Sequence, residues 1–237
     1  MLLRTLLFLL TTLPALAQNT PRWQPYVRAG LGLSRAICPE TNSVVRFNIG
    51  NGDPTKPILG GKDWLSAGQV SIGFTRTLDG QFYIQAEAGV ERKGSARHLT
   101  IIYSYCGVAG CSGTSYTGVG SSRATYLTVP VLVGYRFSKL NLAVGPYVSY
   151  KLGERQVYYL TTNNQPPPLI RPDMAISEYD AWDAGFAVNL TYPLASRFKL
   201  DMRYSQGMTS IAKQYEQFTE KSYHQSAQVG LNYFPFR

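Results

Sequence analysis

Two adjacent runs of alternating residues, joined by the dipeptide Ser138-Lys139, constrain the fold of this chain more than any other stretch. Between Thr125 and Leu152, apolar residues take one face of each run, and small, polar or charged residues take the other. A period of two over this length indicates strands. Each run has about 11 residues, roughly twice the usual globular strand and close to what a tilted strand needs to cross a bilayer. The stretch therefore predicts a hairpin of a membrane barrel.

Eight such runs can be followed along the chain. They span about Tyr26 to Arg35, Leu65 to Thr77, Gln81 to Lys93, Thr125 to Phe137, Leu140 to Leu152, Ala181 to Tyr192, Phe198 to Ser205 and Ser226 to Tyr233. The connections alternate between short turns and long segments rich in Gly, Asn and Pro, which cover residues 36–63, 94–122, 153–179 and 206–221. We expect these four to be loops, and we expect Pro166, Pro167 and Pro168 to exclude a continuous strand in the third.

This layout is typical of outer-membrane proteins, whose short turns are periplasmic and whose long loops are extracellular. The sequence thus predicts an all-β fold, an eight-stranded antiparallel transmembrane barrel in which run eight pairs with run one, since lipid tolerates no open sheet edge. The alternative is a secreted soluble barrel with an apolar ligand cavity. Charged residues on the polar faces and aromatic residues at the ends of the apolar faces favour the membrane barrel.

The first 17 residues resemble a secretory signal peptide, because Arg4 precedes the apolar run Leu6 to Leu10 and Ala15-Leu16-Ala17 forms a small-x-small cleavage site. We expect cleavage after Ala17, leaving residues 18–237 as one barrel domain in the outer membrane of a Gram-negative bacterium. The net charge is +9, but the basic residues form no cluster in the sequence. Anionic lipid headgroups are therefore favoured over nucleic acid as partners.

The three cysteines are Cys38, Cys106 and Cys111. An exported chain can form disulfides, and the short separation of Cys106 and Cys111 makes them the candidate pair. Cys38 is then left free or competes for one of them. A metal site would need more ligands, and neither His98 nor His224 stands at ligand spacing to the cysteines. We expect no metal and no cofactor.

Three segments resemble the outer membrane protein beta-barrel domain family, the PorT-like porin family of Bacteroidetes. They are Tyr126 to Phe137, which contains a Y-x-x-x-P-x-L-x-x-Y-R-F pattern, Gly145 to Tyr150, and Asp201 to Ile211. The resemblance implies a small closed barrel, with some members attached to protein secretion or gliding machinery, and it implies no catalytic residues. The chain departs from the usual terminal aromatic, because Arg237 follows Phe234-Pro235-Phe236.

The polar faces carry a candidate network of charges in the lumen. Its members are Glu87, Glu91, Arg136, Lys151, Asp183, Asp201 and Arg203. These side chains could line a narrow transport channel, but eight strands enclose only enough room for side chains. Buried charges must also be paired or solvated. We therefore expect a packed network of ion pairs rather than a pore.

A second set of charges, Arg35, Arg92 and Arg123, faces lipid by its position in the alternation, at the extracellular ends of the runs. A basic ring at this height could bind the phosphates of lipopolysaccharide. The alternative is ordinary snorkelling of arginine side chains at an interface.

One short motif, His224-Gln225-Ser226, resembles the His-x-Ser pair of an outer-membrane lipid A deacylase. The alternation points both residues into the lumen and away from a lipid substrate, which favours polar filler. We therefore expect a non-enzymatic barrel whose long loops bind partners in envelope integrity, adhesion or a secretion or gliding complex. A channel is the main alternative, and a lipid A-modifying enzyme is a remote one.

Overall fold

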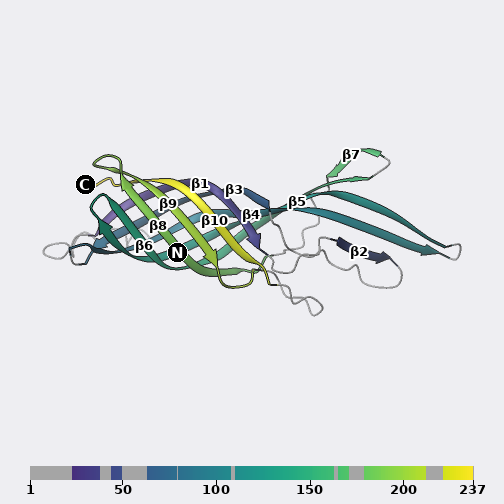
Figure 1. The fold of residues 1–237 in the computed structure, drawn as a ribbon, viewed down its shortest axis with the longest axis horizontal. Helices are drawn as coiled ribbons and strands as arrows, with labels where there is room; N and C mark the ends of the chain where they lie inside the picture. Colours follow the sequence, from purple (N-terminus) through teal and green to yellow (C-terminus); the bar gives the residue numbers. More distant parts are fainter. Residues whose placement is uncertain are drawn as a thin grey trace, which may run out of the picture.

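The computed structural model describes residues 23–37, 44–49, 63–78, 80–107, 110–162, 165–170, 179–211 and 221–236. These contain ten strands: β1 (Gln24–Ile37), β2 (Val44–Ile49), β3 (Asp63–Thr77), β4 (Phe82–Gly107), β5 (Gly110–Phe137), β6 (Leu140–Thr162), β7 (Gln165–Ile170), β8 (Trp182–Pro193), β9 (Phe198–Gly207) and β10 (Tyr223–Tyr233) (Figure 1). No helix in the described part of the chain combines the length and the apolar character needed to cross a membrane. The expected signal peptide, residues 1–17, and Cys38 lie outside the described residues.

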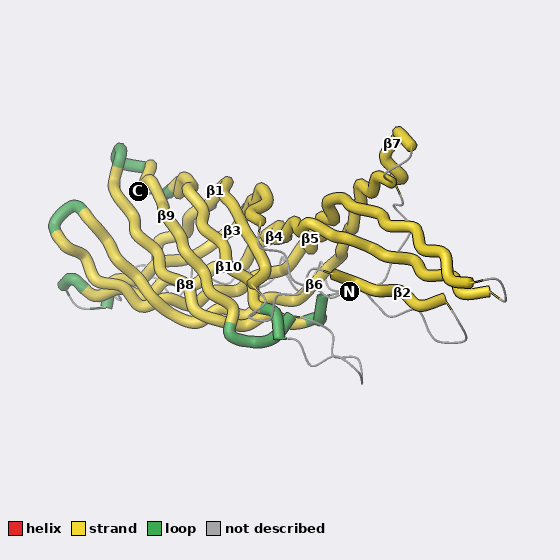
Figure 2. The backbone as a smooth tube through the Cα atoms, turned by 45° about the vertical axis from the view of Figure 1, so that its right-hand side comes forward, coloured by secondary structure: helices red, strands yellow, loops and turns green. Residues whose placement is uncertain are grey.

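Eight of the strands close into a barrel in the order β1-β3-β4-β5-β6-β8-β9-β10, and β10 returns to β1 (Figures 1 and 2). Every neighbouring pair around the ring is antiparallel. The closing register runs from Val27 opposite Tyr233 to Ile37 opposite Tyr223. The predicted eight-stranded antiparallel barrel is confirmed.

The barrel is turned inside out relative to a soluble one. Leu31 is 77% exposed on its outer wall, whereas Arg28 and Ser34 on the same strand are fully buried in the lumen. The same contrast recurs around the ring. Exposed apolar side chains include Val70, Ile72, Val131, Val133, Val144, Val148, Met202 and Val229, and buried polar ones include Gln69, Glu87, Asp183, Asn189, Asp201 and Gln228. An apolar outer wall and a polar interior are what a membrane barrel requires.

Three short connections lie at one end of the barrel. The β5–β6 turn is Ser138-Lys139 with φ of 47° at Ser138, and the β3–β4 turn contains Gly80 with φ of 49°. Aromatic rings gather at this end, with Phe82 and Tyr135 at 5.0 Å and Phe198 and Tyr233 at 5.1 Å between centroids. These rings form one of the two aromatic girdles expected at the membrane interfaces.

At the other end of the barrel, the structure contradicts the expected loop of residues 94–122. Strands β4 and β5 continue through it as a regular ladder, from Gly94 opposite Arg123 to Gly107 opposite Gly110. The sequence Leu-Thr-Ile-Ile-Tyr-Ser-Tyr of residues 99–105 has high β propensity. The many glycines of this segment suggested a loop, but they lie within a paired hairpin.

Two further long connections also contain strands. In residues 153–179, β6 extends to Thr162, and β7 pairs with it through Tyr159 opposite Ile170. The three prolines were expected to exclude a continuous strand, and β6 and β7 are indeed two separate strands, but the prolines do not prevent a strand at Gln165–Ile170. Strand β7 is an edge strand, and its Cα partners on β6 involve Gln165, Leu169 and Ile170 and none of the prolines. In residues 36–63, β2 pairs in parallel with β4, from Val44 opposite Thr100 to Ile49 opposite Tyr105.

These extensions form one sheet outside the barrel, in the order β2-β4-β5-β6-β7. We call it the projecting sheet, and define it as β2, β7 and the parts of β4, β5 and β6 beyond the register Ala96–Ser121–Val157. It extends from the end of the barrel opposite the short turns (Figure 1). The connection of residues 206–221 differs, since β9 ends at Gly207 and β10 begins at Tyr223.

Candidate functional site

The lumen of the barrel is filled by its own side chains. Two cavities of about 10 Å³ each lie within it, one lined by residues that include Tyr83 and Arg136, the other by residues that include Glu91 and Tyr147. A cavity of this size holds about one water molecule. The chemistry of the interior is therefore set by contacts between side chains.

The first cluster in the lumen centres on Glu87 of β4. Arg203 of β9 binds this carboxylate with two hydrogen bonds of 2.6 and 2.9 Å, and both side chains are buried. Tyr26, Ser71 and Gln85 also donate to Glu87, at 2.5, 3.1 and 2.6 Å. A bidentate arginine with three further donors satisfies the buried carboxylate almost completely.

The second cluster centres on Arg28 of β1, which is fully buried. Its Nε donates to Asp201 of β9 at 2.5 Å, and its Nη1 donates to Gln69 at 2.5 Å. Gln228 of β10 accepts from the same guanidinium at 3.3 and 3.4 Å. Arg28 thereby joins residues of four strands.

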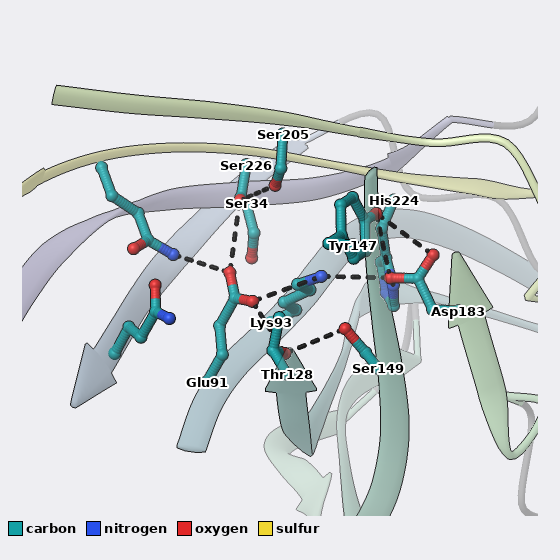
Figure 3. A network of polar contacts seen from close by, with 12 residues as sticks. Ser34, Glu91, Lys93, Thr128, Tyr147, Ser149, Asp183, Ser205, His224 and Ser226 are labelled. Carbon is teal, nitrogen blue, oxygen red and sulfur yellow. Dashed lines mark hydrogen bonds and ion pairs between the residues drawn. The ribbon is translucent and has the colours of Figure 1, made fainter. Parts of the chain in front are cut away.

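The third cluster surrounds Lys93 of β4 (Figure 3). Its ammonium lies 3.0 Å from Asp183 of β8 and 3.4 Å from Glu91, and 4.5 Å above the ring of Tyr147. Asp183 also accepts from the Tyr147 hydroxyl at 3.3 Å, and lies 3.4 Å from His224 Nδ1. A buried lysine is stable in this position because two carboxylates and an aromatic face replace its water.

Polar side chains complete the surroundings of Glu91. Thr128 donates to one carboxylate oxygen at 3.1 Å, and Gln228 donates to the other at 2.7 Å. Since Gln228 also contacts Arg28, the second and third clusters are connected. These two clusters thus form one linked network, which extends from Gln69 to His224.

The end of the lumen below the projecting sheet is closed by Tyr179 and Ile211, which are buried against Ala36, Ala124 and Tyr126. The backbone N–H of Asp180 donates to the Ile211 carbonyl at 2.6 Å. Lys151 donates to the Tyr179 carbonyl and forms an ion pair of 3.0 Å with Glu154. This part of the chain acts as a lid fixed to the barrel wall.

At the opposite end, near the short turns, Phe234 is buried against Tyr26, with 5.2 Å between ring centroids. The Lys199 ammonium lies 4.4 Å from the Phe234 ring centroid. Arg136 donates to Thr77 at 2.9 Å and lies 5.4 Å above the Tyr83 ring. Aromatic and basic side chains therefore cover this end.

The structure brings together most of the charges predicted for the lumen, although in separate clusters. Glu87 pairs with Arg203, while Glu91 and Asp183 share Lys93. Asp201 lies with Arg28. Lys151 of β6 binds the lid through the Tyr179 carbonyl, and Arg136 lies apart from the clusters, near the short turns.

Sequence reasoning missed Arg28 and Lys93 as members of the network, together with Tyr26, Gln69, Tyr147 and Gln228. Arg28 and Lys93 alternate with outward apolar residues, so the period of two already placed them in the lumen. Only the three-dimensional contacts show that they are the cations on which the second and third clusters depend.

The motif His224-Gln225-Ser226 lies inside this network. His224 is buried between Tyr126 and Tyr179, and the Ser226 hydroxyl lies 2.6 Å from that of Ser205 and 3.4 Å from Glu91. His224 and Ser226 thus face the packed interior rather than the outer wall. Among the described residues, no group of three or more His, Cys, Asp and Glu side chains is placed to hold a metal ion.

The lipid-facing arginines occupy different surroundings. Arg35 is half-buried, donates to Gln225 at 2.9 Å and lies 4.6 Å above the Trp64 ring. Arg123 is also half-buried, whereas Arg92 is exposed. Arg92 is therefore the most exposed of the three arginines.

The Cα atoms of Cys106 and Cys111 are direct partners in the β4–β5 register. Their side chains and the whole of Cys38 lie outside what the structure describes. The disulfide between Cys106 and Cys111 stays a prediction.

Solved structures with a similar course of the chain include other outer-membrane barrels. Ail, the attachment invasion locus protein of Yersinia pestis, in a complex with the heparin analogue sucrose octasulfate, has 9% identity and a TM-score of 0.35, over 89% of this chain and 98% of Ail. Neisserial surface protein A has 11% identity and a TM-score of 0.39, over 89% of this chain and 96% of its own.

The Pseudomonas putida toluene transporter TodX has 6% identity and a TM-score of 0.23, over 89% of each chain. A comparison with curated protein sequences gives no significant match. The model of the family described as outer membrane protein beta-barrel domain matches residues 17–213, most of the chain. Together with the closed antiparallel barrel and its apolar outer wall, this match shows that the chain belongs to the outer membrane protein beta-barrel domain family and resides in the outer membrane.

Proposed function

We propose that this protein is a non-enzymatic outer-membrane anchor, whose projecting sheet presents an interaction surface to a protein partner outside the cell. The observation that carries the proposal is the contrast between a packed, ion-paired lumen and strands β4, β5 and β6 that continue in register beyond the barrel (Figures 1 and 2).

The packed lumen supports an anchor rather than a conduit. The charged side chains that could line a channel bind one another across the interior, and the lid of Tyr179 and Ile211 covers one end. The expected result in planar bilayers is no steady conductance from the purified protein. A well-defined single-channel conductance from the wild type would contradict the packed interior and favour a channel.

The projecting sheet supports a role in recognition because it offers edges. Among the described strands, β2 pairs with β4 alone and β7 with β6 alone, so each has one side whose backbone groups pair with no other described strand. Such an edge can pair with a strand of another protein. Adhesion, envelope integrity and assembly with secretion or gliding machinery are all served by this kind of surface. The resemblance of three sequence segments to the PorT-like porin family, described above, supports the last of these roles.

The proposal includes an orientation. In outer-membrane barrels the short turns face the periplasm, so the projecting sheet would lie outside the cell, and export would follow cleavage after Ala17. An epitope inserted between Gly107 and Gly110 should bind antibody on intact cells, and the same epitope at Ser138-Lys139 should bind only after permeabilisation. The reverse pattern would contradict the orientation.

The partner is tested by affinity capture of the full chain from its own outer membrane. The matched variant replaces residues 99–118 with Asn-Gly, which joins His98 and Val119, Cα partners in the ladder, by a two-residue turn. Both proteins should keep the barrel, seen as faster migration of unheated samples in detergent gels. Proteins that co-purify with the wild type should be lost from the shortened variant, and an identical set from both would refute the role of the sheet.

A further inference from the structure

The outer wall of the barrel is hollowed over strands β4, β3, β1, β10 and β9. The groove has a volume of about 930 Å³ and is lined by apolar side chains that include Leu31, Val70, Val229 and Leu231. Gly68 belongs to the lining and has no side chain that would fill the groove. A single cation, Arg92, belongs to the same lining.

A β-bulge produces part of this shape. Trp64 pairs with Ser95 and Gly68 pairs with Arg92, so β3 uses one residue more than β4 between these two pairs. Bulges redirect side chains and bend the strand locally. Here the bulge lies directly beside Arg92, since Gly68 is its partner in the ladder.

Arg92 is exposed, whereas Arg35 and Arg123 are half-buried. The side chain of Arg92 forms no hydrogen bond or ion pair with another residue of the described chain. Arg35, by contrast, is held by Gln225 and stacks on Trp64. A cation on the lipid-facing wall is costly without an anionic partner. The guanidinium fork is suited to a phosphate, which it can bind with two hydrogen bonds.

We propose that the groove binds one molecule of the lipid A part of lipopolysaccharide, with an acyl chain against Leu31 and Val229 and a phosphate on Arg92. The choice of lipid A rests on the orientation proposed above, because Arg92 lies toward the end with the projecting sheet and hence in the outer leaflet. The apolar lining suits the acyl chain of lipid A, and Arg92, the one cation of the lining, suits the phosphate of its headgroup. The site is separate from the sheet edges proposed to bind a protein.

The test uses native mass spectrometry of the full chain, released from micelles that contain lipid A, dephosphorylated lipid A or phosphatidylglycerol. The wild type should retain one lipid A molecule. Arg92→Gln should reduce retention about tenfold, the effect of losing one charge-assisted contact. Arg155→Gln is the matched control, since Arg155 is also exposed but does not belong to the groove lining, and it should retain lipid A like the wild type.

A second variant tests the groove independently of charge. A Cβ atom at position 68 would lie 3.6 Å from Leu31 Cδ2, an ordinary contact. Gly68→Leu should therefore preserve the barrel but fill the groove, and it should also lose lipid A. Heat-dependent migration in detergent gels verifies folding of each variant.

Equal retention of lipid A by Arg92→Gln and the wild type would overturn the proposal, as would unchanged binding by Gly68→Leu. Stronger retention of phosphatidylglycerol than of lipid A would also overturn it, because the site would then recognise a phospholipid. None of these outcomes depends on affinity capture through the projecting sheet. The lipid site and the proposed protein partner are therefore tested separately.

Discussion

The stability of the barrel should depend on the ion pair between Glu87 and Arg203. Both side chains lie in the lumen, and the exposed fractions are 0% for Glu87 and 5% for Arg203. Removing one partner of a buried pair costs about 3 to 5 kcal/mol, because the remaining charge has neither water nor a counter-ion. By the scaling for domains of this size, such a loss lowers the unfolding temperature by about 6 to 20 °C.

The contacts of the pair predict which variant suffers more. In Arg203→Ala, Glu87 keeps the donors Tyr26, Ser71 and Gln85. The loss of unfolding free energy should therefore lie near the lower limit of the range given above. In Glu87→Ala, Arg203 loses both hydrogen bonds and the same donors lose their acceptor. We therefore expect Glu87→Ala to be the less stable variant, near the upper limit of the range.

The assay is the temperature at which the fast-migrating folded band converts to the unfolded band in detergent gels. Arg92→Ala is the control, since it removes an exposed cation from the outer wall and should leave this temperature nearly unchanged. A double variant, Glu87→Met with Arg203→Leu, should lose less than the sum of the single variants, because apolar replacement of both charges leaves none unpaired. Equal shifts for Glu87→Ala and Arg92→Ala would refute the reasoning.

Three further outcomes are expected. The protein should fractionate with the outer membrane and migrate faster unheated than boiled, and recovery as a soluble periplasmic protein would contradict the barrel. Peptide mapping without reduction should find Cys106 bonded to Cys111 and Cys38 as a free thiol, whereas a Cys38 link to either cysteine would show this pairing wrong. Gly145→Ala should prevent or strongly weaken barrel formation in a refolding assay, because its Cβ would lie 2.1 Å from the Val131 carbonyl oxygen, while Gly153→Ala, with nothing within 4 Å, should refold normally. Equal refolding of both glycine variants would show that the strands do not approach so closely.

The barrel could be predicted from the sequence because its fold depends on a short-range pattern. A strand with one face in lipid and one in the lumen must alternate, and residues such as Leu31 and Arg28 record that alternation directly. The three short turns divided the chain into hairpins. Closure of β10 on β1 then followed from the physics of a lipid environment, where an open edge has no hydrogen-bond partner.

The projecting sheet was not predicted, because it contains glycines and prolines, which are usually found in loops. The glycines of residues 94–122 and the prolines of β7 usually indicate loops. A paired hairpin tolerates glycine, however, and an edge strand tolerates proline when its free side lacks a partner. Neither the pairing of β4 with β5 beyond Ala96 nor the edge position of β7 is a property of local sequence.

The sequence predicted which side chains enter the lumen, but not which of them contact one another. Alternation shows which side chains enter the lumen, but the partner of each depends on how strands from opposite walls face one another. Lys93 on β4 meets Asp183 on β8, and Arg28 on β1 meets Asp201 on β9, although neither pair belongs to adjacent strands. Such contacts follow from the shear and tilt of the closed barrel, which no single run of residues reveals.

These contacts across the lumen also explain why we place function outside the barrel. Glu87 with Arg203 ties β4 to β9, and Lys93 with Asp183 ties β4 to β8. A passage through the interior would have to separate such pairs, each at a cost of about 3 to 5 kcal/mol if a charge were left alone. No strand could move outward without exposing polar groups to lipid. A wall held together in this way can hold a sheet at a fixed position beyond the barrel, and that is the role which we propose for it from the extended strands β4, β5 and β6.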